Sequence, residues 1–471
     1  MELADVMGDA AAGLEPVEVS TLAYDNRVVT PGTLFFCVRG FTRDGHEFAD
    51  DAIARGAAAL VVDHRLDVDV PQVVVPDVRA AMAPAAAALA GNPTARLRVA
   101  GVTGTNGKTT TAYLTRALLE AGGHRTGLLG TVASVIGGDE QPTVRTTPEA
   151  IDLQRTFAAM LDAGDTHCVM EVSSHALELH RADAIHWAAV VFTNLSQDHL
   201  DFHPSMEEYF QAKRRLFLAA GDAPRIVNID DEHGRRLAEE FPGAVTYAIE
   251  REAVLRPDRV ASDATGATIE VHGHEFRIPL PGRFNVLNAL AAIGVAGQLG
   301  VGPEDIARGL ATARTAPGRF QPVDGGQDFT VLVDYAHTPD ALDNVLRAAR
   351  ELTGGRVIVV FGAGGDRDHG KRPLMGDAAV ARADRVIVTS DNPRSEDPDA
   401  IIAEVAGDHD VTRIADRRAA IAAALAEAQA GDVVVIAGKG HEQGQEFAGG
   451  RKEPFDDVTV ALEELRAAVE R

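Results

Sequence analysis

The sequence predicts an α/β protein built of three domains. Its 471 residues are enough for three domains of about 150 residues each. Short apolar runs alternate with helical stretches along nearly the whole chain, which is typical of layered α/β folds. Polar loops follow these runs repeatedly, as they do at the ligand-binding edge of a parallel sheet. We expect the domains to cover residues 1–94, 95–318 and 319–471.

Composition and charge exclude several classes of protein. Hydrophobic residues make up 45% and charged residues 24%, the balance of a soluble globular protein. No run of about 18 apolar residues and no signal peptide is present, so we expect no membrane contact. The net charge of −25 argues against non-specific binding of nucleic acid. Cys37 and Cys168 lie in apolar runs, which indicates buried thiols and a cytoplasmic protein.

The first domain is predicted from three short apolar runs. We expect strands at Thr33–Val38, Ala58–Val62 and Gln72–Val75, and an alanine-rich helix at Arg79–Gly91. The break Gly91-Asn-Pro-Thr94 ends this domain.

A glycine-rich segment then carries the strongest functional signal. It follows an apolar strand end and opens a helix, so its backbone N–H groups would cradle a phosphate. Lys108 would reach the β- and γ-phosphates of ATP, and Thr109 or Thr110 would offer a hydroxyl to Mg²⁺. Val102 replaces the first glycine of the strict phosphate-loop pattern, and the alternative is a tight turn without a ligand. The predicted ATP-binding residues here are Gly104, Thr105, Asn106, Gly107, Lys108, Thr109 and Thr110.

Three further strands are predicted in the middle domain, at Thr166–Val172, Ala188–Thr193 and Arg225–Asn228. Glu171 closes the first, and His199 lies in the loop after the second. An ionised glutamate in so apolar a strand needs a partner, and Mg²⁺ takes carboxylate oxygens. A lone histidine is more often a structural hydrogen bonder, so both interpretations of His199 stay open.

Lys213 lies on the apolar stripe of a helix predicted over Ser205–Ala219. Met206, Phe210 and Phe217 share that stripe. Periodicity alone favours a lysine that snorkels to solvent. The alternative is a buried amine with a lowered pKa, which CO₂ would convert into an anionic carbamate ligand.

The last domain repeats strand and polar loop four times. We expect strands at Phe329–Val333, Arg356–Phe361, Arg385–Thr389 and Asp432–Ala437. Gly362-Ala-Gly-Gly lacks the spacing of a dinucleotide fingerprint. Cationic and anionic side chains both occur in these loops, which favours an amino acid substrate. The candidates for carboxylates are Lys371, Arg372 and Arg394, and those for an ammonium are Asp391, Asn392 and Glu442.

Ordered motifs along nearly the whole chain resemble the Mur ligases of peptidoglycan synthesis. They are Asp25-Asn-Arg27, Pro31-Gly32, Asp44-Gly-His46, Gly104–Thr110, Thr146-Thr-Pro148, Glu171–Leu177, Thr193–Asp201, Asn285–Ala291, Asp334–Pro339, Asp391-Asn-Pro-Arg394 and Gly438–Glu442. Val102 is then a feature of the family. The resemblance implies a three-domain architecture: a small α/β domain, a central P-loop ATPase-like parallel-sheet domain and a C-terminal Rossmann-like domain.

The resemblance also implies roles for individual residues. Lys108, Lys213 as a carbamate, His199 and Glu171 would be catalytic, and the last three would hold Mg²⁺ with Thr109. Asn285, Arg319 and Asp334 would complete the ATP site. The UDP-linked substrate would bind Tyr24, Asn26, Thr146, Thr147, Ser173 and Arg181. Diaminopimelate would bind Arg367, Asp391, Asn392, Pro393, Arg394, Gly438 and Glu442. The family usually has Ser where Asn26 stands, and some relatives have a polar residue at Leu179.

The implied reaction is an ATP-dependent amide-bond ligation. Meso-2,6-diaminopimelate would be joined to UDP-N-acetylmuramoyl-L-alanyl-D-glutamate through an acyl phosphate, in a cytoplasmic and monomeric enzyme. Arg394 favours diaminopimelate, since lysine has no second carboxylate to pair with it. The alternatives are ligation of L-lysine or another amino acid, a phosphoryl transferase, and a nucleotide-binding regulator. His337 and His441 are the candidate bases for the amine.

Overall fold

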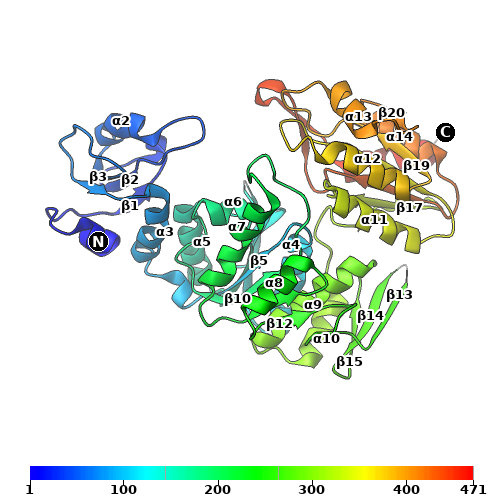
Figure 1. The fold of residues 1–471 in the computed structure, drawn as a ribbon, viewed down its shortest axis with the longest axis horizontal. Helices are drawn as coiled ribbons and strands as arrows, with labels where there is room; N and C mark the ends of the chain where they lie inside the picture. The colour runs from blue at the N-terminus through cyan, green and yellow to red at the C-terminus, as the bar shows by residue number, and fades with distance from the viewer. Residues whose placement is uncertain (144, 264, 470–471) are drawn as a thin grey trace. The chain divides into compact units, whose positions relative to one another are not determined.

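The computed structural model describes residues 1–143, 145–263 and 265–469. The chain divides by its internal contacts into two compact units, and Figure 1 shows their elements from the blue N-terminus to the red C-terminus. The first unit comprises Met1–Thr103, Gly123–Val190 and Ala212–Pro224, and the second comprises Gly104–Gly122, Val191–Gln211 and Arg225–Arg471.

A parallel sheet with the order β1-β2-β3-β4 begins the first unit. Its strands are β1 (Thr21–Ala23), β2 (Thr33–Phe36), β3 (Ala57–Val62) and β4 (Gln72–Val74), with helices α1 (Leu3–Met7), α2 (Ala49–Ala54) and α3 (Val78–Leu89). Asp77 caps α3 by accepting from two backbone N–H groups of its first turn. Leu34, Val61 and Met82 belong to the core between this sheet and α3.

The first unit also contains most of an eight-stranded sheet. Six neighbouring strands follow the order β10-β5-β9-β6-β7-β8, and β9 pairs in parallel with both β5 and β6. The bounds are β5 (Arg98–Thr103), β6 (Thr126–Leu129), β7 (Ala133–Ile136), β8 (Asp139–Pro142), β9 (His167–Glu171) and β10 (Trp187–Phe192), with helices α5 (Ala150–Asp162) and α6 (Ser174–Glu178). A Cβ on Gly101 of β5 would lie 2.6 Å from the Trp187 ring, so only glycine fits there.

The second unit begins with the phosphate loop and α4 (Lys108–Ala121), which packs against α9 (Arg283–Gln298). β11 (Arg225–Asn228) and β12 (Val245–Tyr247) are its parallel strands from the eight-stranded sheet. An antiparallel sheet of β13 (Arg259–Asp263), β14 (Gly266–Val271) and β15 (His274–Ile278) follows. The remaining helices of this part are α7 (Met206–Ala219), which begins in this unit, α8 (Glu232–Glu240) and α10 (Pro303–Thr312).

A six-stranded sheet with the order β16-β17-β21-β18-β19-β20 carries the rest of the second unit. All neighbours are parallel except β16 and β17. One core contains side chains from α11, α12 and α13, and a second contains side chains from α14 and α15. The strands are β16 (Gln321–Pro322), β17 (Thr330–Asp334), β18 (Val357–Phe361), β19 (Arg385–Val388), β20 (Thr412–Arg413) and β21 (Val433–Ala437), followed by the hairpin β22 (Gly444–Glu446) and β23 (Lys452–Pro454). The helices are α11 (Pro339–Glu351), α12 (Lys371–Arg382), α13 (Pro398–Ala406), α14 (Arg417–Glu427) and α15 (Asp457–Val469).

The predicted fold class is confirmed, and so are the predicted strands. The strand predicted over Arg225–Asn228 has those bounds in β11, while β2 ends at Phe36, two residues before its predicted end. The antiparallel sheet β13–β15 was not predicted. Among the described residues, no helix combines the length and apolar character needed to cross a membrane.

Candidate active site

The phosphate loop joins β5 to α4 through two glycines with positive φ. Gly107 (φ 83°) precedes the first residue of α4, and Gly104 has a φ of 148°. A Cβ on Gly104 would lie 1.8 Å from Thr193 Oγ1, so the loop needs glycine at this position. Lys108 Nζ donates to the carbonyls of Gly104 (3.0 Å) and Thr105 (2.8 Å). The ammonium is therefore held against the loop, where the helix N-terminus also favours anions.

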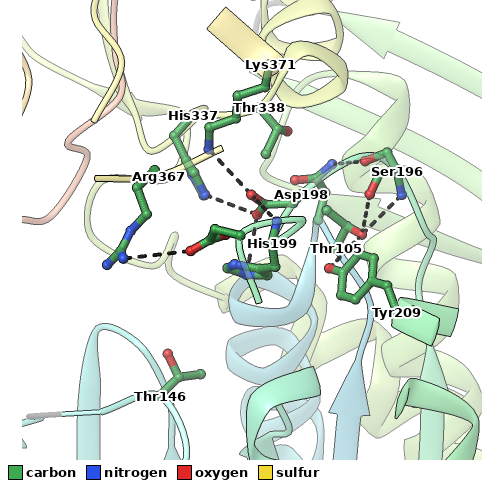
Figure 2. A network of polar contacts seen from close by, with 12 residues as sticks. Thr105, Thr146, Ser196, Asp198, His199, Tyr209, His337, Thr338, Arg367 and Lys371 are labelled. Carbon is green, nitrogen blue, oxygen red and sulfur yellow. Dashed lines mark hydrogen bonds and ion pairs between the residues drawn. The ribbon is translucent and has the colours of Figure 1, made fainter. Parts of the chain in front are cut away.

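The loop that follows β10 braces the phosphate loop. Thr193 Oγ1 donates to the Asn106 carbonyl (2.6 Å), and the Asn106 N–H donates to Asn194 Oδ1 (2.9 Å). Thr105 Oγ1 accepts from the Ser196 N–H at 3.1 Å and lies 3.1 Å from the Tyr209 hydroxyl, as Figure 2 shows. These bonds fix the loop backbone before any ligand contributes.

Asn285, Arg319 and Asp334 also lie in the second unit. Asn285 of α9 is buried and accepts from Asn288 Nδ2 (3.2 Å). Arg319 Nη2 donates to Thr109 Oγ1 (3.1 Å), and its guanidinium lies 4.3 Å from the centre of the Tyr335 ring. Arg319 thus links the phosphate loop to the Tyr335 ring.

Asp334 closes β17 and is buried. Burial raises the pKa of its carboxyl, and the opposing effects of Arg319 and two backbone donors only partly offset this rise. Those donors are the N–H groups of Phe320 and Ala336, both at 2.7 Å. Asp334 therefore fixes the backbone that carries Arg319.

Asp198 is a buried carboxylate that the sequence analysis did not single out. Its oxygens lie 3.4 Å from Lys371 Nζ, 3.4 Å from His199 Nε2 and 3.5 Å from His337 Nε2, and Figure 2 shows these groups converging on it. Burial would raise the pKa of Asp198. The hydrogen bond from His337 and the charges of His199 and Lys371 outweigh burial and hold the pKa well below its usual range.

His199 has a φ of 56°, which is unusual for a residue other than glycine. Its N–H donates to Asp198 Oδ1 (2.9 Å), so Asp198 stabilises this turn as well. A signal for Asp198 was present in the sequence, since it immediately precedes the predicted metal ligand.

Glu171 lies in the first unit, at the carboxyl end of β9, and is 1% exposed. Thr131 donates to both of its oxygens, with its N–H to Oε1 (2.8 Å) and its hydroxyl to Oε2 (3.0 Å). Thr131 Oγ1 is also 3.0 Å from Thr146 Oγ1. The carboxylate is therefore oriented by one residue, and each oxygen retains acceptor capacity.

Thr147, Ser173 and Arg181 form a connected group in the first unit. Thr147 Oγ1 donates to the Glu171 carbonyl (2.9 Å) and accepts from the Ser173 N–H (3.1 Å). Arg181 Nη2 lies 2.9 Å from Glu149 Oε1, and burial lowers the pKa of Arg181. Thr146 and Thr147, two of the residues predicted for the UDP-linked substrate, thus lie close to Glu171.

Tyr24 and Asn26 hold polar contacts of their own near the N-terminus. The Tyr24 hydroxyl donates to Asp152 Oδ2 (2.7 Å), and Asn26 Nδ2 donates to Asp51 Oδ2 (2.8 Å). Burial raises the pKa of Tyr24, and the Asp152 carboxylate adds to the effect.

Lys213 of α7 is 1% exposed, so it does not snorkel to solvent. Phe210 and Phe217 of the same stripe are buried too, as the periodicity predicted. The predicted metal ligands fall in both units: Glu171 and Lys213 in the first, and Thr109 and His199 in the second. Their joint geometry and the carbamate stay predictions.

The loops after β19 and β21 meet through Asn392, Lys439 and Glu442. Asn392 Nδ2 donates to Glu442 Oε2 (2.8 Å), and Lys439 Nζ donates to Asn392 Oδ1 and Glu442 Oε2, both at 3.0 Å. Burial raises the pKa of Glu442, but the charge of Lys439 and these hydrogen bonds lower it overall. Lys439 was not predicted as a site residue.

Arg394 belongs to the same group of loops and has a φ of 51°. Its Nε donates to Glu446 Oε2 (3.1 Å) and its Nη1 to the Gly365 carbonyl (2.7 Å). These contacts orient the guanidinium. Gly438 lies against Asp391, since a Cβ there would be 2.6 Å from Asp391 Oδ2. Pro393 is buried between Asn392 and Arg394, and Arg367 is half-exposed, 4.0 Å from Asp201.

Two interpretations of charged residues in this region are wrong. Arg372 was a candidate for holding a substrate carboxylate, but it is 0% exposed and donates to Glu396 and Glu404, both at 2.8 Å. Its charge is neutralised inside the protein. Lys371 pairs with Asp198 in the same way. Both are cations on the first turn of α12, and the sequence did not reveal their distant carboxylates.

A braced phosphate loop, together with charged loops at the carboxyl edge of a doubly wound sheet, is the arrangement of an ATP-dependent ligase. Residues 102–296 match the Mur ligase middle domain, residues 318–440 the glutamate ligase domain of Mur ligases, and residues 18–99 the catalytic domain of the Mur ligase family. The chain belongs to the Mur ligase family.

Individual relatives cover nearly the whole chain. UDP-N-acetylmuramoyl-L-alanyl-D-glutamate–2,6-diaminopimelate ligase of Solibacter usitatus is 47% identical, over 97% of this chain and 95% of its own. The enzyme of that name from Streptomyces coelicolor is 45% identical, over 99% of this chain and 96% of its own. A solved structure of a ligase of that name has a TM-score of 0.68 at 35% identity, covering 96% of this chain and 95% of its own.

Proposed function

We propose that this chain is the ATP-dependent ligase that adds meso-2,6-diaminopimelate to UDP-N-acetylmuramoyl-L-alanyl-D-glutamate in peptidoglycan precursor synthesis. The observation that carries the proposal is the coexistence of two sites in the second unit. One is the braced phosphate loop, and the other is the group of loops formed by Asn392, Arg394, Lys439 and Glu442. Full-length relatives that carry this name support the same assignment.

The phosphate loop and its neighbours bind ATP in this proposal. The loop Gly104–Thr110 and the α4 N-terminus cradle the phosphates. The N–H groups of Thr105 and Asn106 are donated to Asn194 and instead hold the loop in shape. Lys108 moves from the carbonyls that it contacts to the phosphate oxygens, and Arg319 is held beside Thr109. Both cations stabilise negative charge on the transferring phosphoryl group. Asn285 and Asp334 support these positions from α9 and β17.

The residues assigned to Mg²⁺ suit a hard cation in their donor set. Glu171 is buried, and its two oxygens accept from Thr131 alone among the described hydrogen bonds, so a cation would satisfy its remaining charge. Thr109, His199 and carbamylated Lys213 are the other ligands that the family resemblance implies. When bound, Mg²⁺ supplies charge neutralisation for the phosphates.

The reaction runs through an acyl phosphate. The D-Glu side-chain carboxylate attacks the γ-phosphorus of ATP, an O–P bond forms, and ADP leaves. The amine of diaminopimelate then attacks the activated carbonyl carbon, an amide bond forms and phosphate leaves with the bonding electrons. The amine loses its proton to a base, for which His337 and His441 are the candidates. Thr146, Thr147, Ser173 and Arg181 hold the UDP-linked substrate, with Tyr24 and Asn26 at the uridine.

Arg394 supplies the preference for diaminopimelate. Glu446 and Gly365 aim its guanidinium from two sides, so it is ordered before the substrate arrives. Diaminopimelate has a second carboxylate for the guanidinium N–H groups that Glu446 and Gly365 do not use, whereas lysine has no second carboxylate to offer them. Arg367, Asp391, Pro393 and Gly438 complete the pocket.

The decisive experiment compares phosphate release from ATP with the UDP-linked dipeptide and either meso-diaminopimelate or L-lysine. We expect kcat/KM to favour diaminopimelate by at least about tenfold, and the preference to fall in Arg394→Ala. Arg451→Ala, which removes an exposed arginine of the same region, is the matched control. Equal kcat/KM for the two amino acids in the wild-type chain contradicts the assignment of Arg394.

Trapping separates the ligase from a phosphoryl transferase. Hydroxylamine converts an acyl phosphate into a hydroxamate, so a ligase yields hydroxamate without amino acid and tripeptide with it. A stable phosphorylated product that diaminopimelate does not consume indicates a transferase. We also propose that the enzyme is cytoplasmic and monomeric. Light scattering on the purified chain tests whether it is a monomer.

A further inference from the structure

Lys439 is a buried ammonium between the two loops of the amino acid site. It follows β21, its side chain is 0% exposed, and its Nζ lies 3.0 Å from Asn392 Oδ1, 3.0 Å from Glu442 Oε2 and 4.0 Å from Asp391 Oδ1. A buried cation needs such partners, because desolvation of an unpaired charge costs several kcal/mol. Lys439 therefore ties the loop after β19 to the loop after β21.

The contacts of Lys439 fix which way the Asn392 amide points. Asn392 Oδ1 accepts from Lys439 Nζ and also from the Glu446 N–H, each at 3.0 Å. Both partners are donors only, so the atom that they share must be the oxygen. The two lone pairs of that oxygen are then occupied. Asn392 consequently offers only N–H groups to other partners, and one of these is given to Glu442 Oε2 at 2.8 Å.

Two consequences follow for recognition of the amino acid. The Asn392 carbonyl oxygen already accepts two hydrogen bonds, which argues against Asn392 as an acceptor for a substrate ammonium. Glu442 Oε2 already accepts from Asn392 and Lys439, whereas Oε1 has no hydrogen bond among the described contacts. Glu442 is about one-third exposed, so Oε1 is the oxygen of this network that suits a substrate ammonium.

We propose that Lys439 is a positioning residue that determines which atoms of the amino acid site act as hydrogen-bond donors and which as acceptors. It locks Asn392 as a hydrogen-bond donor and holds one oxygen of Glu442, leaving the other for the substrate. Asn392 then presents one amide donor, and Glu442 presents one carboxylate oxygen. These two groups match an amino acid centre that bears both a carboxylate and an ammonium. The inference rests on the proposed function, since it concerns how that site recognises its amino acid substrate.

Lys439→Met tests the positioning role, because Met has a similar length and neither charge nor donor. We expect KM for meso-diaminopimelate to rise at least about tenfold, because the variant loses one charge-assisted hydrogen bond. KM for ATP and for the UDP-linked dipeptide should change by less than about threefold, because the described contacts of Lys439 Nζ are all with residues of the amino acid site. Lys452→Met, at an exposed lysine of β23, is the control and should match the wild type. A folded Lys439→Met variant with an unchanged KM for diaminopimelate overturns the proposal.

Asn392→Asp tests the amide orientation without removing Lys439. The substitution keeps an oxygen for Lys439 and Glu446 but replaces the Nδ2 donor by a second oxygen. If Asn392 acts as a donor, KM for diaminopimelate rises at least about tenfold. If it accepts from an ammonium, the added negative charge leaves this KM unchanged or lowers it, and the proposal fails. Because Lys439 stays in place, an unchanged or lowered KM in this variant refutes the proposal even where Lys439→Met does not fold.

The wild-type chain provides the control that separates the two proposals. If it releases no phosphate in response to diaminopimelate, the proposed function fails. If it does so, and both variants retain its KM for diaminopimelate, the role of Lys439 alone is refuted.

Discussion

Lys371 Nζ lies 3.4 Å from Asp198 Oδ1, and both side chains are buried. Lys371 is the first residue of α12, and Asp198 lies in the loop after β10, 173 positions earlier. The pair therefore joins segments of the second unit that are remote in the sequence. His337, in the loop before α11, contacts the same carboxylate.

We predict that Asp198→Asn destabilises the protein by about 3–5 kcal/mol, because it leaves the Lys371 ammonium buried without an anion. Urea unfolding followed by circular dichroism measures the loss. Asp201→Asn is the control: Asp201 lies 4.0 Å from a half-exposed arginine, so its loss should cost less than about 1 kcal/mol. Equal effects of the two substitutions would show that the Asp198 pair contributes little.

A second prediction concerns acid stability and the pair of Arg372 with Glu396. The hydrogen bond from Arg372 lowers the pKa of Glu396 to about 2. A carboxyl with a depressed folded pKa stabilises the fold above its unfolded pKa, and this stability is lost as the pH falls towards the folded value. We expect the wild type to lose up to about 3 kcal/mol between about pH 5 and pH 2 through this group.

Glu396→Gln removes that component, so the stability of the variant should depend less on pH in this window. Urea midpoints measured at several pH values provide the comparison. Glu463→Gln, at a surface ion pair, should retain the wild-type slope. Parallel pH profiles for Glu396→Gln and the wild type would refute the prediction.

His167 gives a third prediction in a different pH window. Burial lowers its pKa to about 4, and the charges of His124 and Arg98 add to the effect. The unfolded chain takes up a proton near pH 6.5, whereas the folded chain resists protonation, so stability falls as the pH drops from about 6.5 to about 4.

We expect His167→Gln to flatten the stability profile between about pH 6.5 and pH 4. The substitution also removes packed atoms, so the slope of stability against pH is the informative quantity, not its absolute value. His64→Gln, at an exposed histidine, serves as the control. An unchanged slope in His167→Gln would mean that another group titrates in this window.

A fourth prediction follows from the packing of the phosphate loop. Gly104→Ala places a Cβ 1.8 Å from Thr193 Oγ1. Either the phosphate loop or the segment after β10 that contains Thr193 must therefore move. We expect the affinity for a non-hydrolysable ATP analogue, measured by calorimetry, to fall at least about tenfold. Gly297→Ala in α9, where nothing lies within 4 Å, should retain affinity and gain up to about 1 kcal/mol of stability. Wild-type affinity in Gly104→Ala would show that the loop relaxes without cost.

The sequence pattern was sufficient for the strands that cross the interior. Arg225–Asn228 and Asp432–Ala437 are short, apolar and followed by polar residues, and such runs form buried parallel strands. The antiparallel sheet β13–β15 carries many polar residues and was missed. Ala267, Ile269 and Val271 are buried at every second position of β14. This alternation of apolar residues in the sequence would have predicted the strand.

The sequence indicated candidate site residues where a residue has a local motif, and it was misleading where the partner of a residue is distant in the chain. Lys108 and Arg394 stand in recognisable loops. Arg372 stands in an equally suggestive position, yet Glu396 and Glu404 neutralise it from elsewhere in the chain. Asp198 and Lys439 were missed for a related reason: a charged residue in a polar loop does not reveal its burial until the opposing loop is placed.

The Asn392 amide, whose orientation Lys439 fixes, also has a chemical weakness. Asparagine side chains deamidate to aspartate when the backbone nitrogen of the next residue attacks the side-chain carbonyl and closes a five-membered imide ring. Here the next residue is Pro393, whose nitrogen carries no hydrogen and cannot complete that ring. The proline therefore protects the amide from spontaneous deamidation, so a long-lived copy of the enzyme keeps its donor at position 392.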